Sequence, residues 1–269
     1  MKFQGLKARK DLGQHFLADE EAIAQIIAAA EIKASDTVVE IGPGPGVLTP
    51  LIADAAKKVI AVELDSAMIP HLKRAVSAHS NVEILEGDVL AVDPTEYPAP
   101  YSVVSNVPYY ITSAILRHFL ECANKPERMT LTVQREVAQR IVATPPKMSI
   151  LALSIQLYGS PEIAEIIPRK SFVPPPEVDS AILVIRDIGK DTKKRLDGLS
   201  EEAFFTLVRA GFSEKRKQLH NSLARNLDLS HEQAVGLLES VNVNPQRRAE
   251  TVTIAEWVSI GQAYGSIAR

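Results

Sequence analysis

Short runs of β-branched and apolar residues alternate with helical patterns along the first two thirds of the chain, and this alternation limits the possible folds more than any other feature. The runs occupy residues 37–41, 58–64, 81–87, 101–106 and 129–134. The stretches between them space their apolar residues as one face of a helix does. Strands that alternate with helices form a parallel sheet covered by helices, so we expect an α/β fold.

Two more strand-like runs follow, at 150–159 and 178–187, and a proline-rich segment separates them. Proline cannot donate a hydrogen bond to a sheet, so this segment is neither a helix nor a central strand. We expect the two runs to form a hairpin that closes the edge of the sheet.

Beyond residue 187 the strand pattern stops and four helical patterns follow. Two of them begin with a capping box, Ser230 with Gln233 and Thr253 with Glu256. The segment 188–199 contains two glycines and several charges, as linkers between domains do. We therefore expect two domains, residues 1–188 with the sheet and residues 189–269 with helices only.

The composition excludes several classes of protein. Hydrophobic residues make up 46% and charged residues 23% of the 269 residues, as in water-soluble globular proteins. No apolar stretch approaches the length that spans a bilayer, and the N-terminus has no secretory signal pattern. The single cysteine, Cys122, forms no internal disulfide. We expect a cytoplasmic protein that does not enter a membrane.

The formal net charge of −3 hides two basic clusters. Such clusters can bind the phosphates of a nucleic acid, although solvated charged faces are equally common. We predict that both clusters contact RNA. Their members are Lys7, Arg9 and Lys10 near the N-terminus, and Lys215, Arg216 and Lys217 near the start of a helix.

The sharpest local motif is a glycine-rich turn, Glu40-Ile-Gly42-Pro-Gly44-Pro-Gly46, between the first of these strand-like runs and a helix. Glycines there let a ligand approach the backbone closely. A dinucleotide fingerprint requires glycine where Val47 stands, so the motif suits S-adenosylmethionine better than a pyrophosphate. The alternative is an ordinary tight turn.

Two acidic residues follow the next two strands. Glu63 can accept hydrogen bonds from both ribose hydroxyls of an adenosine, and Asp88 can accept one from an adenine amino group. Each acid alone is more often a solvated loop residue. Together with the glycine turn, they indicate a nucleoside site at the carboxyl edge of the sheet.

Asn106-Val-Pro108-Tyr109 follows the fourth strand. The exocyclic amine of a base is a poor nucleophile, because its lone pair is delocalised into the ring. The side-chain oxygen of Asn106 and the carbonyl of Pro108 can accept its two hydrogens and favour a tetrahedral nitrogen. Tyr109 can stack on a flipped base, and Phe172 can hold it from the other side, although a packed tyrosine and a core phenylalanine are the alternatives.

Five motifs occur in order and together resemble the ribosomal RNA adenine dimethyltransferases over nearly the whole chain. They are Gly13-Gln-His-Phe-Leu17, the turn at 40–46, Asn106-Val-Pro-Tyr109, Phe172-Val-Pro-Pro-Pro and Phe212-Ser-Glu-Lys-Arg-Lys. The resemblance implies a Rossmann-like, seven-stranded methyltransferase sheet followed by a helical RNA-binding domain. It also implies the site residues. The methyl donor would contact His15, Leu17, Gly42, Gly44, Glu63, Asp88 and Asn106, and the target base would contact Asn106, Pro108, Tyr109 and Phe172.

The resemblance implies dimethylation of N6 on two adjacent adenines in a hairpin near the 3' end of small-subunit (16S) ribosomal RNA. S-adenosylmethionine would be the methyl donor, no metal would be needed, and a partly assembled small subunit would be the partner of a monomeric enzyme. Two alternatives remain open. One is a large-subunit (23S) methyltransferase of the macrolide-resistance type, and the other is an assembly factor without catalytic activity.

Overall fold

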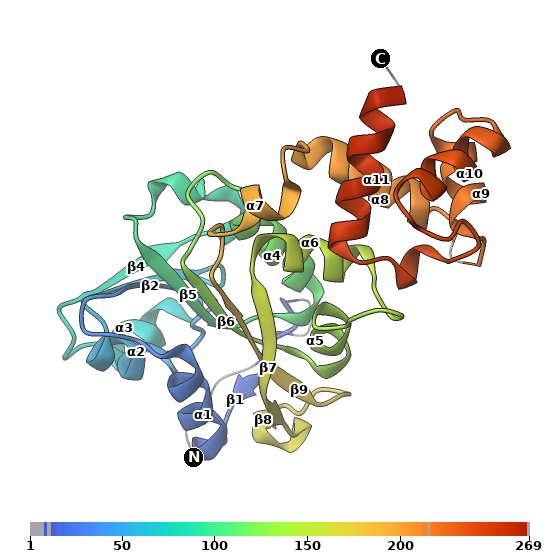
Figure 1. Cartoon of the computed structure of the whole chain (residues 1–269). Coiled ribbons are helices and arrows are strands. Elements are labelled where there is room, and N and C mark those ends of the chain that lie inside the picture. The colour runs from blue at the N-terminus through green and yellow to red at the C-terminus, as the bar shows by residue number, and fades with distance from the viewer. Residues whose placement is uncertain (1–7, 10–11, 215, 268–269) are drawn as a thin grey trace. The chain divides into compact units, whose positions relative to one another are not determined.

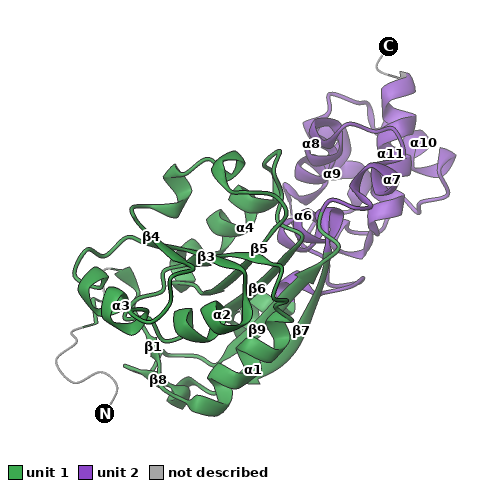
Figure 2. Cartoon of the chain, turned by 90° about the vertical axis from the view of Figure 1, so that its left-hand side faces the viewer, with its two compact units in different colours: residues 1–139, 160–188 green, residues 140–159, 189–269 purple. Residues whose placement is uncertain are grey.

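The computed structural model describes residues 8–9, 12–214 and 216–267. The chain divides into two compact units, coloured separately in Figure 2. Unit 1 contains residues 1–139 and 160–188, and unit 2 contains residues 140–159 and 189–269. The segment 140–159 therefore packs with the C-terminal helices, although it lies within the range that the sequence assigns to the sheet domain.

Unit 1 is built on a seven-stranded sheet with the strand order β4-β3-β2-β5-β6-β9-β7, whose strands other than β3 are labelled in Figure 1. Neighbouring strands from β4 to β6 run parallel, whereas β9 is antiparallel to both β6 and β7. The strands are β2 (Thr37–Ile41), β3 (Lys58–Glu63), β4 (Val82–Glu86), β5 (Tyr101–Asn106), β6 (Arg128–Gln134), β7 (Ser160–Ile167) and β9 (Ser180–Arg186). The expected α/β class and the seven-stranded methyltransferase-type sheet are confirmed.

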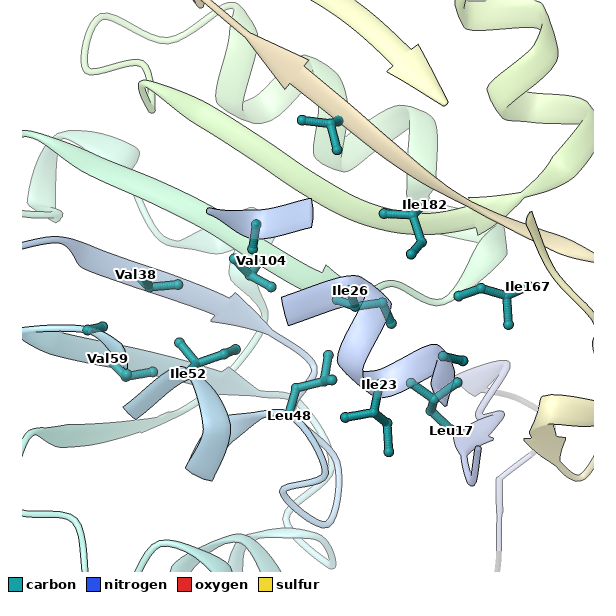
Figure 3. Close-up of a cluster of buried hydrophobic side chains, with 14 of the residues drawn as sticks. Leu17, Ile23, Ile26, Val38, Leu48, Ile52, Val59, Val104, Ile167 and Ile182 are labelled. Carbon is teal, nitrogen blue, oxygen red and sulfur yellow. The ribbon is translucent and has the colours of Figure 1, made fainter. Parts of the chain in front are cut away.

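A large apolar cluster lies between one face of this sheet and two helices, as Figure 3 shows. Helix α1 (Glu20–Ala30) contributes Ile23 and Ile26, and helix α2 (Thr49–Ala55) contributes Ile52. Asp19 caps α1 by accepting hydrogen bonds from two free amides of the first turn. Because α1 is anchored in this core, the chain before it is held next to the sheet.

Three more helices belong wholly or mostly to the unit 1 sequence: α3 (Ile69–Ala75), α4 (Thr112–Leu120) and α5 (Arg135–Ile141). A second, two-stranded sheet joins β1 (Phe16–Leu17) to β8 (Phe172–Val173). The pairing places Leu17 opposite Phe172. It ties the segment before α1 to the proline-rich segment 171–177, which no sequence pattern predicted.

The predicted strand at 150–159 is wrong. Residues Ile150–Tyr158 form helix α6, which Ser149 caps with a hydrogen bond from the amide of Ala152, and the edge strand β7 begins directly after it. A continuous apolar run fits a buried helix as well as a buried strand, because neither has a polar face. The edge hairpin exists, but it consists of β7 and β9.

Unit 2 consists of α6 and the helices that follow β9, with two of their starts fixed by local hydrogen bonds. Both predicted capping boxes are present, at Ser230 with Gln233 and at Thr253 with Glu256. The buried ring of Trp257 lies at the centre of this unit. Its helices are α7 (Thr192–Leu196), α8 (Glu201–Phe212), α9 (Leu219–Asn226), α10 (His231–Ser240) and α11 (Ile254–Ile267).

The length and hydropathy of the described helices decide whether any of them could cross a membrane. Within the described part of the chain, no helix combines the length and the apolar character that crossing a bilayer requires.

Candidate active site

Unit 1 contains a pocket at the carboxyl ends of the parallel strands, where ligands of α/β proteins bind. Residues from five parts of the chain line it. They are 12–17 before α1, 40–45 with 47–48 at the glycine turn, 62–64 at the end of β3, 87–89 after β4, and 106–111 at the end of β5 and beyond it. Except for Phe172, every residue that the sequence assigns to the donor or the base lines this pocket.

The glycine turn leaves β2 with three residues in the left-handed region. Gly42, Gly44 and Gly46 have φ angles of +60°, +58° and +85°, which side chains strongly disfavour. At Gly42 a Cβ atom would meet nothing closer than Pro108, at 4.0 Å. Because Gly42 has no side chain, open space remains between the glycine turn and the loop after β5.

Glu63 ends β3 and turns its carboxylate into the pocket. One oxygen accepts a hydrogen bond of 2.7 Å from the amide of Gly44, and the other accepts one of 2.7 Å from the amide of Asp65. The side chain is only 4% exposed, and burial raises the pKa of its carboxyl. Each oxygen still has a second lone pair, so the group can accept two further hydrogen bonds.

Asp88 follows β4 and caps a short 3-10 turn, Val89–Ala91. Its Oδ1 accepts a hydrogen bond of 2.9 Å from the amide of Leu90. Because this bond fixes the side chain, its second oxygen has a defined position at the pocket wall. The carboxylate can accept one more hydrogen bond from a ligand.

Glu40 also lines the pocket, and the sequence analysis gave it no role beyond membership of the motif. It is 2% exposed, and its Oε2 has no hydrogen-bond partner within the described residues. Burial, more than the neighbouring Glu63, raises the pKa of Glu40 to about 8. The carboxyl is therefore protonated at neutral pH.

Asn106 is the last residue of β5 and lies at the centre of the pocket. Its Nδ2 donates a hydrogen bond of 3.1 Å to the carbonyl of His15. The preceding residue, Ser105, donates to the carbonyl of Ile41 and ties β5 to β2 at this edge. Because Nδ2 is engaged, the amide presents its Oδ1 as an acceptor, as the predicted contact with an amine requires.

Pro108 and Tyr109 begin the loop after β5. The carbonyl of Pro108 accepts a hydrogen bond of 3.2 Å from the amide of Ile111 and keeps a second lone pair. The hydroxyl of Tyr109 shares a hydrogen bond of 2.6 Å with that of Ser180, and burial raises the pKa of this phenol. The ring of His15 stacks on Tyr109, with 5.8 Å between the ring centroids.

Phe172 does not lie in the pocket wall. Its side chain is 2% exposed and belongs to the apolar cluster that also contains Leu17 and Ile167. In this conformation Phe172 supports the site from behind, and the ring that faces Tyr109 is that of His15.

The predicted basic clusters fall only partly within the described residues. Arg216 and Lys217 are exposed in the turn before α9, and Arg9 lies with its guanidinium 3.9 Å from the carboxylate of Asp65. Lys7, Lys10 and Lys215 lie outside the described residues.

Three residues that the sequence analysis did not single out complete the site: Gln14, Asp65 and Tyr110. Asp65 is 3% exposed, and its Oδ2 accepts a hydrogen bond of 2.8 Å from Nε2 of Gln14. Tyr110, 60% exposed, stands at the rim beside Gly13. The sequence offered one indication of these roles: Asp65 follows Glu63 by two residues, at the end of a strand.

The donor set suits a nucleoside that carries an amino-acid tail. Paired acceptors at Glu63 match two adjacent hydroxyls, the free oxygen of Asp88 matches an amino group, and the space at Gly42 admits a chain against the backbone. These residues therefore fit S-adenosylmethionine. Across the described residues, no group of three or more His, Cys, Asp or Glu side chains is placed to hold a metal ion.

Comparisons with known proteins agree with this geometry. The family model described as ribosomal RNA adenine dimethylase matches residues 5–260. A ribosomal RNA small subunit methyltransferase A from Dehalococcoides mccartyi is 46% identical over 262 residues, covering 96% of this chain and 89% of that protein. A protein of the same name from Listeria monocytogenes is 36% identical and covers 98% of this chain and 93% of its own length.

Solved structures show the same fold. A dimethyladenosine transferase from Plasmodium falciparum superimposes with a TM-score of 0.81 at 25% identity, covering 94% of this chain and 98% of that one. The 23S rRNA methyltransferase ErmE superimposes with a TM-score of 0.74 at 29% identity, covering 92% and 98%. Both likenesses extend over nearly the full length of both chains.

Proposed function

The chain belongs to the ribosomal RNA adenine dimethylase family, and on that basis we propose that its pocket dimethylates N6 of adenines in small-subunit (16S) ribosomal RNA. The methyl donor is S-adenosylmethionine. The observation that carries the proposal is the position of Asn106, which lines the pocket while its amide nitrogen donates to the carbonyl of His15, so that its oxygen remains available as an acceptor.

Residues at the ends of β2, β3 and β4 would hold the donor. Glu63 would accept hydrogen bonds from its ribose hydroxyls, and Asp88 would accept one from its adenine amino group. Gly42 and Gly44 would leave room for its amino-acid part, and His15 and Leu17 would contact it from the segment before α1. When bound, the donor supplies a methyl group made electrophilic by a sulfonium.

The residues after β5 prepare the acceptor nitrogen. Asn106 Oδ1 and the carbonyl of Pro108 accept the two hydrogens of the adenine amine, which draws its lone pair out of the ring and towards the methyl group. Transfer would form the N6–CH3 bond as the S–CH3 bond of the sulfonium breaks, the donor would leave as a neutral thioether, and the cationic N6 would then lose a proton to water. No strong base is required, and the raised pKa of Tyr109 keeps that phenol neutral.

The target base must leave its stack to reach this pocket. Tyr109 provides a ring held in place by Ser180, on which an adenine can stack. Phe172 contributes by packing behind the pocket wall, next to Leu17.

The RNA outside the pocket is held by charge and shape. Arg9, Arg216 and Lys217 contact phosphates, and the partner is a partly assembled small subunit. The two adenines are adjacent and lie in the hairpin near the 3' end of the RNA. We expect the enzyme to act as a monomer in the cytoplasm.

The test is to incubate the purified chain with S-adenosylmethionine and either unmethylated small subunits or large-subunit RNA. Dimethyladenosine is then quantified by nuclease digestion and mass spectrometry. We expect product from small subunits only. Product from large-subunit RNA would assign the chain to the resistance type, to which the match with ErmE also points. Donor binding without product from either RNA would support a non-catalytic assembly factor.

A further inference from the structure

A short segment before α1 crosses the pocket from the donor side to the base side. We name residues 12–17 the strap, and all six line the pocket. Its C-terminal end is fixed where Phe16 and Leu17 pair with β8. At its N-terminal end no strand pairs with it among the described residues, and the amides of Leu12 and Gln14 donate hydrogen bonds to the carbonyl of Arg9.

On the donor side, the strap is joined to the loop after β3. Gln14 Nε2 donates a hydrogen bond of 2.8 Å to Asp65 Oδ2. The amide of Asp65 in turn donates to Glu63, the residue proposed to hold the ribose. A chain of two hydrogen bonds therefore connects the strap to the donor carboxylate.

On the base side, the same strap contacts the loop after β5 three times. The carbonyl of His15 holds Asn106 Nδ2, and the ring of His15 stacks on Tyr109. Gly13, with φ at +58°, lies so close to Tyr110 that a Cβ atom would stand 3.2 Å from its ring. Gln14 is adjacent to both of these strap residues.

The chemistry of Gln14 suits this bridging position. Its Oε1 accepts a hydrogen bond of 2.9 Å from the amide of Arg9 while its Nε2 donates to Asp65. Only an amide of this length both accepts and donates there without adding charge. The carboxylate of Asp65 is almost fully buried, so among the described residues loss of this donor leaves its charge with only the amide of Ala67 and the more distant guanidinium of Arg9.

We propose that the Gln14–Asp65 hydrogen bond is a latch that closes the strap over the donor and holds Asn106 in its working orientation. The inference rests on the proposed function and names Gln14 as a positioning residue for it. Because each adenine receives two methyl groups, the strap opens for donor exchange between transfers. A single hydrogen bond between a neutral amide and a carboxylate can break and reform at each exchange.

The experiment compares Gln14→Ala, Gln14→Glu, Asp65→Asn and the double variant Gln14→Glu with Asp65→Asn. The double variant exchanges amide and carboxylate and so restores a hydrogen bond between the same two positions. The matched control is Gln233→Ala, which removes a glutamine with a structural bond to Ser230 in unit 2. Donor dissociation constants are measured by calorimetry without RNA, and kcat, the KM for each substrate and thermal melting are measured beside them.

We expect Gln14→Ala to weaken donor binding by about tenfold and to lower kcat, because a hydrogen bond to a charged group is lost. Gln14→Glu places a second carboxylate against Asp65 and should be more severe. Asp65→Asn keeps an acceptor for Gln14 but loses the charge that faces Arg9, so it should weaken donor binding less than Gln14→Ala does. The exchanged pair should recover most of the loss of Gln14→Glu. The KM for RNA should not change in any of these variants. The control variant should keep the donor affinity and kcat of the wild type.

If the wild type binds the donor and Gln14→Ala keeps the same donor affinity and kcat, the latch proposal is wrong, whereas the proposed function still stands. A Gln14→Glu defect that the exchanged pair does not repair would also overturn the latch. Failure of the wild type to bind S-adenosylmethionine at all would overturn the proposed function, and the latch with it.

Discussion

The two compact units use their long-range hydrogen bonds for different purposes. In unit 1 such bonds shape the pocket, as between Gln14 and Asp65 and between Asn106 and His15. In unit 2 the helix starts are fixed over three residues, as at Ser230 with Gln233. Long-range bonds in unit 2, such as Gln262 to Asp197, connect helices that do not line the pocket. The chemistry therefore depends on the register of the sheet.

We expect the largest loss of activity at Asn106, which is held by a residue distant in the sequence and would contact the reacting amine. Asn106→Ala removes one acceptor for the amine, and we expect single-turnover methyl transfer at saturating RNA to fall by about 100-fold or more. The matched control is Asn226→Ala, which removes an amide from unit 2 that bonds to Ser213 and Ser222. A wild-type rate in Asn106→Ala would contradict the account of the pocket.

A crowded glycine in unit 1 should matter next. A Cβ at Gly46 would stand 2.8 Å from that of Ala75, and its φ of +85° already disfavours a side chain. We expect Gly46→Ala to lower the free energy of unfolding by about 3 kcal/mol. Donor affinity should fall as well, because the turn that carries Gly42 and Gly44 must shift. Urea denaturation and calorimetry measure the two effects, and retention of wild-type donor affinity would argue against a rigid turn.

Glu40 gives unit 1 a dependence on pH. Its pKa is about 8 in the folded protein and near the usual value of 4.5 when unfolded, so the folded state holds a proton that the unfolded state loses. The stability that this group contributes is fully present below pH 4.5 and declines as the pH rises to 8. Glu40→Gln stays neutral, so its stability should lie close to that of the wild type at pH 5 and exceed it by about 3 kcal/mol at pH 7.5. Parallel stability curves from pH 5 to 8 would show that Glu40 keeps an ordinary pKa.

A crowded glycine in unit 2 provides the counterpart. A Cβ at Gly211 in α8 would clash with the ring of Trp257, the only tryptophan in the chain. The clash is partly offset by the better helix propensity of alanine, so we expect Gly211→Ala to destabilise unit 2 by about 1–2 kcal/mol. Tryptophan fluorescence reports the unfolding. Donor affinity should stay at the wild-type value, and a clear loss would contradict the separation of roles.

The exposed cations of unit 2 should have the smallest effect. Replacing Arg216 or Lys217 by glutamine should weaken RNA binding by about three- to tenfold. The slope of the logarithm of the binding constant against the logarithm of the salt concentration should become shallower by about one. The rate at saturating RNA should not change. Lys194→Gln removes a charge from α7 of the same unit and serves as the control. Equal losses in all three variants would show that overall charge, and not these two residues, governs binding.

Local patterns predicted much of this structure from sequence. The strands at 37–41 and 101–106 have the predicted bounds, because β-branched runs end there at a glycine turn or at Asn-Val-Pro. Residues 150–158 were misassigned because the apolar run has no polar face, and the cap at Ser149 was the signal that could have shown a helix.

Donor residues such as Glu63 and Asp88 were found because strand ends of a parallel sheet meet at one edge. The roles of Gln14 and Asp65 could not be predicted, because 51 residues separate them and only the folded register brings them together. The burial of Phe172 depends on the pairing of β1 with β8, which is equally remote in sequence.

The most direct test of the central claim is to map the methyl groups in the RNA. Unmethylated small subunits are treated with the wild-type chain and S-adenosylmethionine, and the 3'-terminal hairpin fragment is sequenced by mass spectrometry. We predict two methyl groups on N6 of each of two adjacent adenines, and none elsewhere. Methyl groups on another base or position, or a fragment left unmodified, would contradict the account.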